Sequence, residues 1–132
     1  MGQDITISCS NCEYNNSFKL GTGYVYLTID NLKTFMNQEK WEEIQNIIRK
    51  ENIFKYDYTH SLYVCETCGK LYNRFYVKVT YGKDKNVYQL NFNCPKCKTK
   101  LTRVKEDFPI DRIPCPVCKE NKLETAINIF WD

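Results

Sequence analysis

The sequence predicts a mostly β fold of the α+β class, with antiparallel hairpins and one amphipathic helix inserted near residues 30–51. Three observations support this prediction. All eight cysteines of the 132 residues fall into four C-x-x-C pairs. Hydrophobic and polar residues alternate between residues 71 and 92, as in a half-buried pair of strands. Apolar residues recur at helical spacing between residues 38 and 51.

Two strands are expected around the first C-x-x-C pair. One leads into Cys9, and the other lies around residues 17–20. Gly21 and Gly23 then indicate a turn. Residues 24–29 are rich in aromatic and β-branched side chains and predict a further strand.

A helix is expected over residues 38–51. Asn37 can cap it, and Glu39 stands in its first turn, where the helix dipole favours a negative charge. Asp30 is expected to cap a shorter helical turn before it. The apolar residues of the two segments are Leu32, Phe35, Met36, Trp41, Ile44, Ile47 and Ile48. We expect this stripe to pack on the domain's own sheet.

The clearest hairpin combines strands over residues 71–81 and 87–92 with a turn at 82–86. A short strand over residues 98–105 and a final strand over 123–131 complete the expected elements. The apolar side of the hairpin carries Leu71, Phe75, Val77, Val79, Tyr81, Tyr88, Leu90 and Phe92. Its other side carries Tyr72, Arg74, Tyr76, Lys78, Gln89 and Asn91.

The four C-x-x-C pairs predict two metal sites. One such turn supplies two sulfurs, and a structural zinc takes four thiolates in a tetrahedron, so each site needs two turns. We therefore expect two structural zinc ions. The expected ligands are Cys9, Cys12, Cys65, Cys68, Cys94, Cys97, Cys115 and Cys118.

Spacing favours one grouping of these turns over another. The 17 residues from 98 to 114 fit the usual separation of roughly 15–20 in a zinc ribbon, which pairs the third turn with the fourth. The first would then meet the second across residues 13–64. In the rival grouping the hairpin of residues 69–93 joins the second turn to the third, and the first meets the fourth.

The favoured grouping divides the chain at residue 70. Residues 1–70 would form a first zinc ribbon with the helical insertion, and residues 71–132 the hairpin and a second ribbon, packed as one compact unit. Units this small bury so little surface that their independent stability is marginal without a staple such as metal.

The second turn opens as Val64-Cys65-Glu66-Thr67-Cys68-Gly69, and Cys-Pro-x-Cys turns follow at residues 94–97 and 115–118. This order resembles the small bacterial zinc-ribbon proteins of the CpXC type. The resemblance covers the four turns and, in outline, residues 9–70. It implies a zinc-ribbon fold and little about activity, because most of that family is of unknown function. The turns at Cys9 and Cys65 depart from the pattern because they lack the proline.

Residues 63–72 also resemble the first metal-binding turn of a rubredoxin, in which four thiolates hold a redox-active iron. That resemblance implies an iron electron carrier as an alternative, since iron and zinc accept the same geometry. The resemblance also implies a small acidic protein with a single metal site. Two sites with lysines beside them favour zinc.

Charge and hydropathy exclude some function classes. The formal net charge is +3, and two loaded four-thiolate sites carrying −2 each would bring it to about −1. A nucleic-acid partner therefore cannot be inferred from overall charge. No apolar run approaches the roughly 20 residues of a membrane span, and the N-terminus lacks a signal-peptide pattern. We expect a cytoplasmic protein without a membrane partner.

An enzyme is not expected, because four thiolates fill the zinc coordination sphere and leave no position for water. The single histidine, His60, is not needed as a ligand. The leading hypothesis is a protein-interaction or adaptor module whose partner is another protein; the oligomeric state stays open. The alternative is a binder of single-stranded nucleic acid, which needs rings alternating with cations. Its candidate residues are Tyr72, Arg74, Tyr76, Lys78, Lys98, Lys100 and Arg103.

Overall fold

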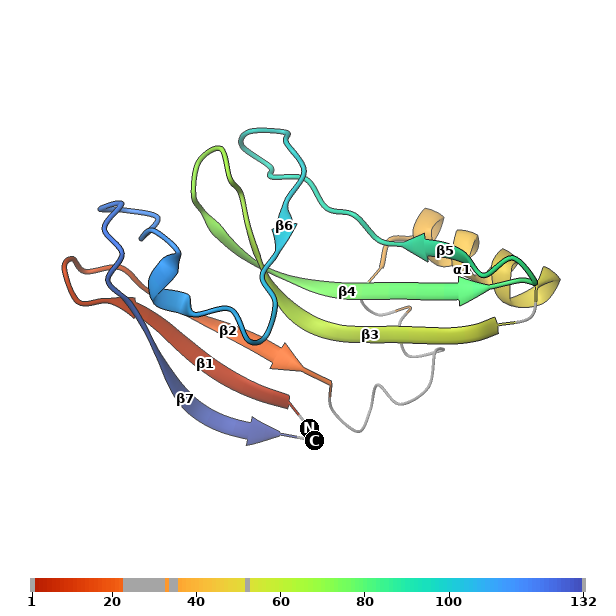
Figure 1. Ribbon diagram of the computed structural model, residues 1–132, viewed down its shortest axis with the longest axis horizontal. Helices are drawn as coiled ribbons and strands as arrows, with labels where there is room; N and C mark the ends of the chain where they lie inside the picture. The colour runs from red at the N-terminus through yellow and green to blue at the C-terminus, as the bar shows by residue number, and fades with distance from the viewer. Residues whose placement is uncertain (1, 23–32, 34–35, 52, 132) are drawn as a thin grey trace.

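A computed structural model describes residues 2–22, 33, 36–51 and 53–131. It contains one antiparallel sheet with the strand order β5-β4-β3-β2-β1-β7, and β6 pairs with β3 beside this path (Figure 1). The strands are β1 (Gly2–Cys9), β2 (Asn15–Gly21), β3 (Ile53–Val64), β4 (Leu71–Tyr81), β5 (Asn86–Gln89), β6 (Thr102–Arg103) and β7 (Leu123–Trp131). The helix α1 spans Gln38–Lys50, and the 3-10 helix η3 spans Ile110–Arg112.

The sheet has two halves that meet at a narrow junction. We call β1, β2 and β7 the terminal half-sheet, and β3, β4, β5 and β6 the central half-sheet. Among the described residues, strands β2 and β3 share a single register pair, Gly21 with His60. Further along β3, residues Tyr63 and Val64 pair with β6 instead. The two half-sheets therefore diverge from the junction, as Figure 1 shows.

The side chain of Asn73, on β4, ties the halves together where the strands separate. Its amide oxygen accepts a hydrogen bond from the backbone N–H of Lys19 on β2, at 2.7 Å. Its amide nitrogen donates to the backbone oxygens of Lys19, at 2.8 Å, and of Ser61 on β3, at 3.1 Å. One side chain thus supplies the hydrogen bonds that strand pairing would otherwise provide.

The helix forms as predicted and packs on the central half-sheet. The Asn37 side chain accepts a hydrogen bond from the Lys40 N–H at 2.8 Å, which satisfies one of the free donors of the first turn. Trp41 and Ile44 are buried against Phe75, Val77 and Val79 of β4, together with Leu90. The expected strand over residues 24–29 lies outside the described residues, and so does the expected helical turn from Asp30, apart from Lys33 and Met36.

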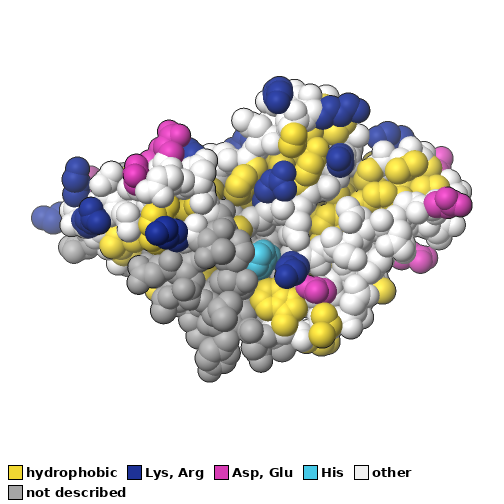
Figure 2. Space-filling view, turned by 180° about the vertical axis from the view of Figure 1, so that it is seen from behind, with side chains coloured by type: hydrophobic (Ala, Val, Ile, Leu, Met, Phe, Trp, Pro, Cys, Tyr) yellow, Lys and Arg dark blue, Asp and Glu magenta, His cyan; other side chains and the backbone are white. Residues whose placement is uncertain are grey.

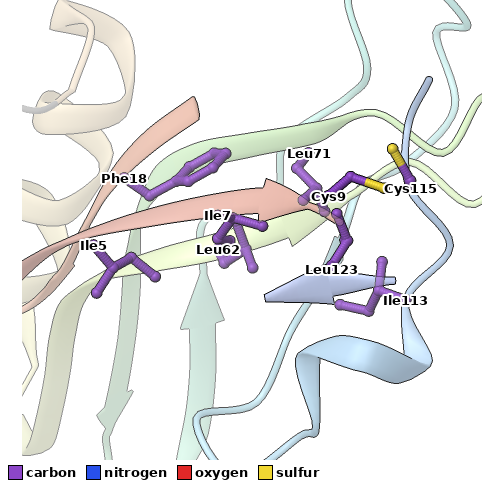
Figure 3. Packing of buried hydrophobic residues seen from close by; sticks show 9 residues of the cluster. All are labelled: Ile5, Ile7, Cys9, Phe18, Leu62, Leu71, Ile113, Cys115 and Leu123. Carbon is purple, nitrogen blue, oxygen red and sulfur yellow. The ribbon is translucent and has the colours of Figure 1, made fainter. Parts of the chain in front are cut away.

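The terminal half-sheet has its own core (Figure 3). We call the face of β1 that carries Ile5 and Ile7 its inner face. The chain between β6 and β7, which includes η3, packs on this face. Because Leu62 and Leu71 of the central strands reach into this core, the two half-sheets share buried surface. The buried residues are Ile5, Ile7, Cys9, Phe18, Leu62, Leu71, Ile113, Cys115 and Leu123.

Two strands are shorter than predicted. β5 ends at Gln89 rather than at Phe92, because the Phe92 ring leaves the strand to pack edge-on against Tyr63, with ring centroids 5.4 Å apart. The basic segment of residues 98–105 pairs over Thr102–Arg103. The two predicted faces of the 71–92 hairpin are confirmed, since Val79 pairs with Tyr88 and Lys78 with Gln89.

The sheet is continuous across the expected division of the chain. The boundary at residue 70 falls between β3 and β4, which pair along their whole length. Across the same boundary, β1 pairs with β7 from Gly2 to Cys9.

In the described part of the chain, no helix combines the length and hydropathy needed to cross a membrane.

Candidate metal centres

The four C-x-x-C turns close in the same way. In all four, the N–H of the first cysteine donates to the backbone oxygen five residues later, which folds the turn tightly enough to bring two sulfurs together. The bonds run from Cys9 to Tyr14 (3.0 Å), Cys65 to Lys70 (3.0 Å), Cys94 to Thr99 (2.8 Å) and Cys115 to Glu120 (2.9 Å).

Three of the turns also contain a residue with positive φ. It stands four positions after the first cysteine and donates its N–H to that cysteine's oxygen. These residues are Gly69 (φ 79°), Lys98 (φ 63°) and Lys119 (φ 67°). Glycine adopts this conformation without strain, whereas a lysine does so at a cost.

The four turns form two clusters of four sulfurs, each within 4.8 Å of one another. Centre 1 contains Cys9, Cys12, Cys115 and Cys118, and centre 2 contains Cys65, Cys68, Cys94 and Cys97. The favoured grouping of first with second and third with fourth is therefore wrong. The reason is strand pairing. β1 and β7 pair so that Cys9 lies beside Leu123, and the β4–β5 hairpin returns the third turn to the second.

The sulfur–sulfur distances fit a tetrahedral metal site. They are 3.6 Å between Cys9 and Cys118 and 3.6 Å between Cys12 and Cys115, and 3.9 Å between Cys68 and Cys94. Four sulfurs about 2.3 Å from a central zinc would lie about 3.8 Å apart, whereas a disulfide needs about 2.05 Å. All eight cysteines are free, so both clusters could hold metal ions.

Backbone N–H groups point at sulfurs in both centres. Such donors stabilise thiolates and hold them in orientation. In centre 1 they come from Asn11 to Cys9, Tyr14 to Cys12 and Val117 to Cys115, each at 3.4 Å. In centre 2 they come from Cys68 to Cys65, at 3.5 Å, and from Cys97 to Cys94, at 3.4 Å.

Centre 2 has two further side-chain partners. The Tyr72 hydroxyl lies 3.3 Å from the Cys94 sulfur, and the Thr99 hydroxyl lies 3.6 Å from the Cys65 sulfur. The hydrogen bond to Cys94, followed by burial, raises the pKa of Tyr72 to about 12. Tyr72 therefore keeps its proton and acts as a donor to the sulfur.

The thiol pKa values show that neither cluster ionises fully by itself. In centre 2, the Cys68 N–H and the Thr99 hydroxyl lower the pKa of Cys65 to about 6. Burial and the neighbouring thiols raise that of Cys97 to about 12. Four crowded thiolates repel one another, and a divalent cation would offset that repulsion.

Centre 1 repeats the pattern. The Asn11 side chain and the Glu120 backbone lower the pKa of Cys118 to about 6. The Tyr14 N–H lowers the pKa of Cys12, but burial and the surrounding thiols outweigh it and raise the value to about 12. Both centres therefore have the donor chemistry of a four-thiolate metal site.

The residues expected to bind nucleic acid lie on one face of β4, at and just after the third turn and, for Arg103, on β6. Their rings already have cations against them: the Arg103 guanidinium lies 3.9 Å from the centre of the Tyr76 ring. Arg74 and Lys70 lie 5.0 Å and 5.4 Å from the Tyr72 ring. Lys78 stands beside Asp57 in the register, and Lys98 and Lys100 are exposed. The cation–ring contacts leave less free ring surface for bases to stack on.

His60 belongs to neither cluster. It lies at the junction, with its ring 4.8 Å from Phe75 and 5.8 Å from Trp131. Figure 2 shows this histidine, in cyan, on a face where basic and acidic side chains are interspersed. Burial first, and then the charge of Lys19, lowers the pKa of His60, while Asp4 opposes the shift.

Sequence reasoning missed several residues that the structure makes prominent. Lys119 reaches from the fourth turn to the second, where its ammonium group donates to the backbone oxygen of Cys68 at 2.9 Å. The sequence contains a signal for this residue, because Lys119 stands four positions after the first cysteine of its turn, where the second turn has Gly69. On β7, three apolar side chains stay more than half exposed: Ile127 (54%), Ile129 (56%) and Phe130 (56%).

A cavity of about 440 Å³ adjoins β7 on the inner face of the terminal half-sheet. Its wall is largely apolar, with polar side chains that include Gln3, His60, Lys105 and Glu106. The apolar lining consists of Ile5, Ile7, Leu20, Leu62, Val104, Phe108, Ile110, Ile127 and Phe130.

No protein-family model, curated protein or solved structure matches the chain.

Proposed function

We propose that the chain is a cytoplasmic protein-interaction module, an adaptor whose fold is held by two structural zinc ions. Centres 1 and 2 each offer four sulfurs at distances that suit a tetrahedral ion, which supports a structural role. Bound zinc would supply four metal–thiolate bonds per centre and hold the turns together. With four protein ligands the ion has no open position, so no catalytic role is assigned to it.

The observation that carries the interaction role is the edge strand β7. It ends the strand order of the sheet, so its outer edge has no partner strand among the described residues. Natural edge strands are usually protected by charges, prolines or short length. β7 has nine residues, no proline and one charge, Glu124, whereas β5 at the other edge has four residues. The exposed Ile127, Ile129 and Phe130 make this edge suited to binding.

The cavity beside β7 indicates the kind of partner. When an extended segment adds to a sheet edge, backbone hydrogen bonds supply affinity, and pockets for alternate side chains supply specificity. Ile127 and Phe130 belong both to β7 and to the cavity wall. We therefore assign as partner an extended segment of another protein that places an apolar side chain in this cavity.

Elemental analysis of purified protein, with thiol titration before and after a chelator, tests the scaffold. About two zinc ions per chain are expected, with the thiols unreactive until the metal is removed. An iron-loaded protein would instead support the electron-carrier alternative. A chain without metal would contradict the scaffold.

The docking surface is tested with Ile127→Lys, which places a charge on β7 at the wall of the cavity, and with Val117→Lys as its control. Val117 is also an exposed apolar residue, at 66%, but it lies on the fourth turn. A complex captured from lysate after nuclease treatment in high salt should persist with V117K and be lost with I127K. Hydrogen exchange on that complex should show newly protected β7 amides. Release by nuclease would favour the nucleic-acid alternative, and protection elsewhere would refute the β7 assignment.

A further inference from the structure

We infer that Lys119 couples metal binding at the two centres, so that loading either centre favours loading of the other. This inference rests on the proposed metal loading. The Lys119 ammonium group donates to the Pro116 oxygen of its own turn at 3.0 Å and to the Cys68 oxygen of the second turn at 2.9 Å. Pro116 lies between two ligands of centre 1, and Cys68 is itself a ligand of centre 2. The amine therefore spans the two centres.

The local geometry is built for this contact. An added Cβ at Gly69 would lie 3.2 Å from the Lys119 nitrogen, closer than nearly all real contacts of that kind. The glycine thus leaves room for the amine. Lys119 itself holds φ at 67°, a conformation in which glycine would be less strained. Its side chain makes hydrogen bonds that a glycine could not.

Coupling follows because the bridge requires both turns to be folded. The amine reaches Cys68 when Lys119 is held by its N–H bond to the Cys115 oxygen, at 3.0 Å. The acceptor is in place when the second turn is closed by the bond from Gly69 to Cys65, at 2.7 Å. Metal at one centre orders one end of the bridge and reduces the cost of ordering the other. By linkage the effect is reciprocal.

Charge acts in the same direction. A divalent ion with four thiolates leaves two negative charges at each centre, and the centres repel each other. An ammonium group between them reduces that repulsion. Lys119 is exposed, so the coupling should lie at the low end of the usual range, about fivefold in affinity. It should weaken as salt rises.

Lys98 provides a matched control. It occupies the same position in the third turn, with φ 63° and the same N–H bond to its cysteine, Cys94, at 2.8 Å. Among the described residues, unlike Lys119, its side chain makes no hydrogen bond to another turn. Lys119→Met and Lys98→Met therefore remove the same charge from equivalent turns, and Lys119→Arg restores charge and reach.

The test is a titration of the metal-free protein with Co²⁺, followed by native mass spectrometry and by the absorption of tetrahedral cobalt thiolate. At half loading, the one-metal species should be more abundant in K119M than in wild type. K98M and K119R should match wild type. Equal one-metal fractions in K119M and K98M, or in K119M and wild type, would overturn the coupling. Failure of every protein to bind metal would instead refute the proposed scaffold.

Discussion

Centres 1 and 2 are assembled from the same turn, but they hold the chain together in different ways. Cys12 and Cys115 of centre 1 stand 103 positions apart, whereas Cys68 and Cys94 of centre 2 stand 26 apart. The fourfold longer loop costs roughly 1.2 kcal/mol more to close in a flexible chain. Centre 2 has hydroxyl groups against its sulfurs, from Tyr72 and Thr99. Centre 1 therefore closes the longer loop, whereas hydroxyl groups support the sulfurs of centre 2.

The largest expected effect on stability comes from two separate variants, each of which removes one ligand from one centre. Cys12→Ser and Cys97→Ser are matched, because both cysteines are half-buried second residues of their turns. Each should reduce the metal content from about two ions to about one. C12S should lower the free energy of unfolding by several kcal/mol and expose the β1, β2 and β7 amides, since a structural zinc contributes on the order of 10 kcal/mol.

C97S should cost less, with exchange faster mainly around the second and third turns. Chemical denaturation and hydrogen exchange would measure both variants. Equal losses, or a larger loss in C97S, would contradict the assignment of topological closure to centre 1.

The next effect tests the junction between the half-sheets. Asn73→Ala removes three hydrogen bonds and leaves the Lys19 backbone groups to find other partners. We expect a loss of about 1–3 kcal/mol in the free energy of unfolding. Asn91→Ala is the control, since Asn91 is exposed and makes one long bond of 3.4 Å within its own segment. Similar small losses in both would show that Asn73 does not hold the junction.

A smaller effect tests the local support of centre 2. Tyr72→Phe removes the hydroxyl next to the Cys94 sulfur and keeps the ring. Because one hydrogen bond contributes about 1 kcal/mol, metal should leave centre 2 roughly fivefold faster. Centre 1 in the same molecule is the internal control. Chelator-driven release, followed with a chromophoric chelator, would resolve two phases. If neither release phase of Tyr72→Phe were faster than in the wild type, the Tyr72 hydroxyl would not stabilise metal at centre 2.

The smallest effect concerns pH at the junction. The pKa of His60 is lowered from 6.5 by burial and by Lys19, so the unfolded chain takes up the proton at a higher pH than the folded chain. The stabilising contribution of neutral His60 is complete above about pH 6.5 and is lost as pH falls toward the folded pKa. NMR titration of this single histidine should give a pKa below 6.5. Asp4→Asn should lower it further, and a rise would contradict the assigned environment.

Local features of the fold could be predicted from sequence, and long-range features could not. Asn37 identified the start of the helix, and alternation identified β4, because those signals lie within a few residues of the elements they form. The eight cysteines were likewise apparent as candidate ligands. Their grouping was predicted wrongly because spacing favours nearby turns, while the β1–β7 pairing joins residues more than a hundred positions apart. The hydrogen bond from Lys119 to Cys68 joins turns of different centres, so it could not be predicted without the observed grouping of the cysteines.

The separation of the ligands in centre 1 also matters during synthesis. At about 5–20 residues per second, the ribosome needs roughly 5–20 s to add the 103 positions between Cys12 and Cys115. Throughout that interval Cys9 and Cys12 are nascent thiols without their partner turn, open to oxidation or to capture by a wrong metal. Centre 2 can close earlier, once the third turn has emerged. The order in which the chain is made thus gives the two centres different exposure in the cell before the fold is complete.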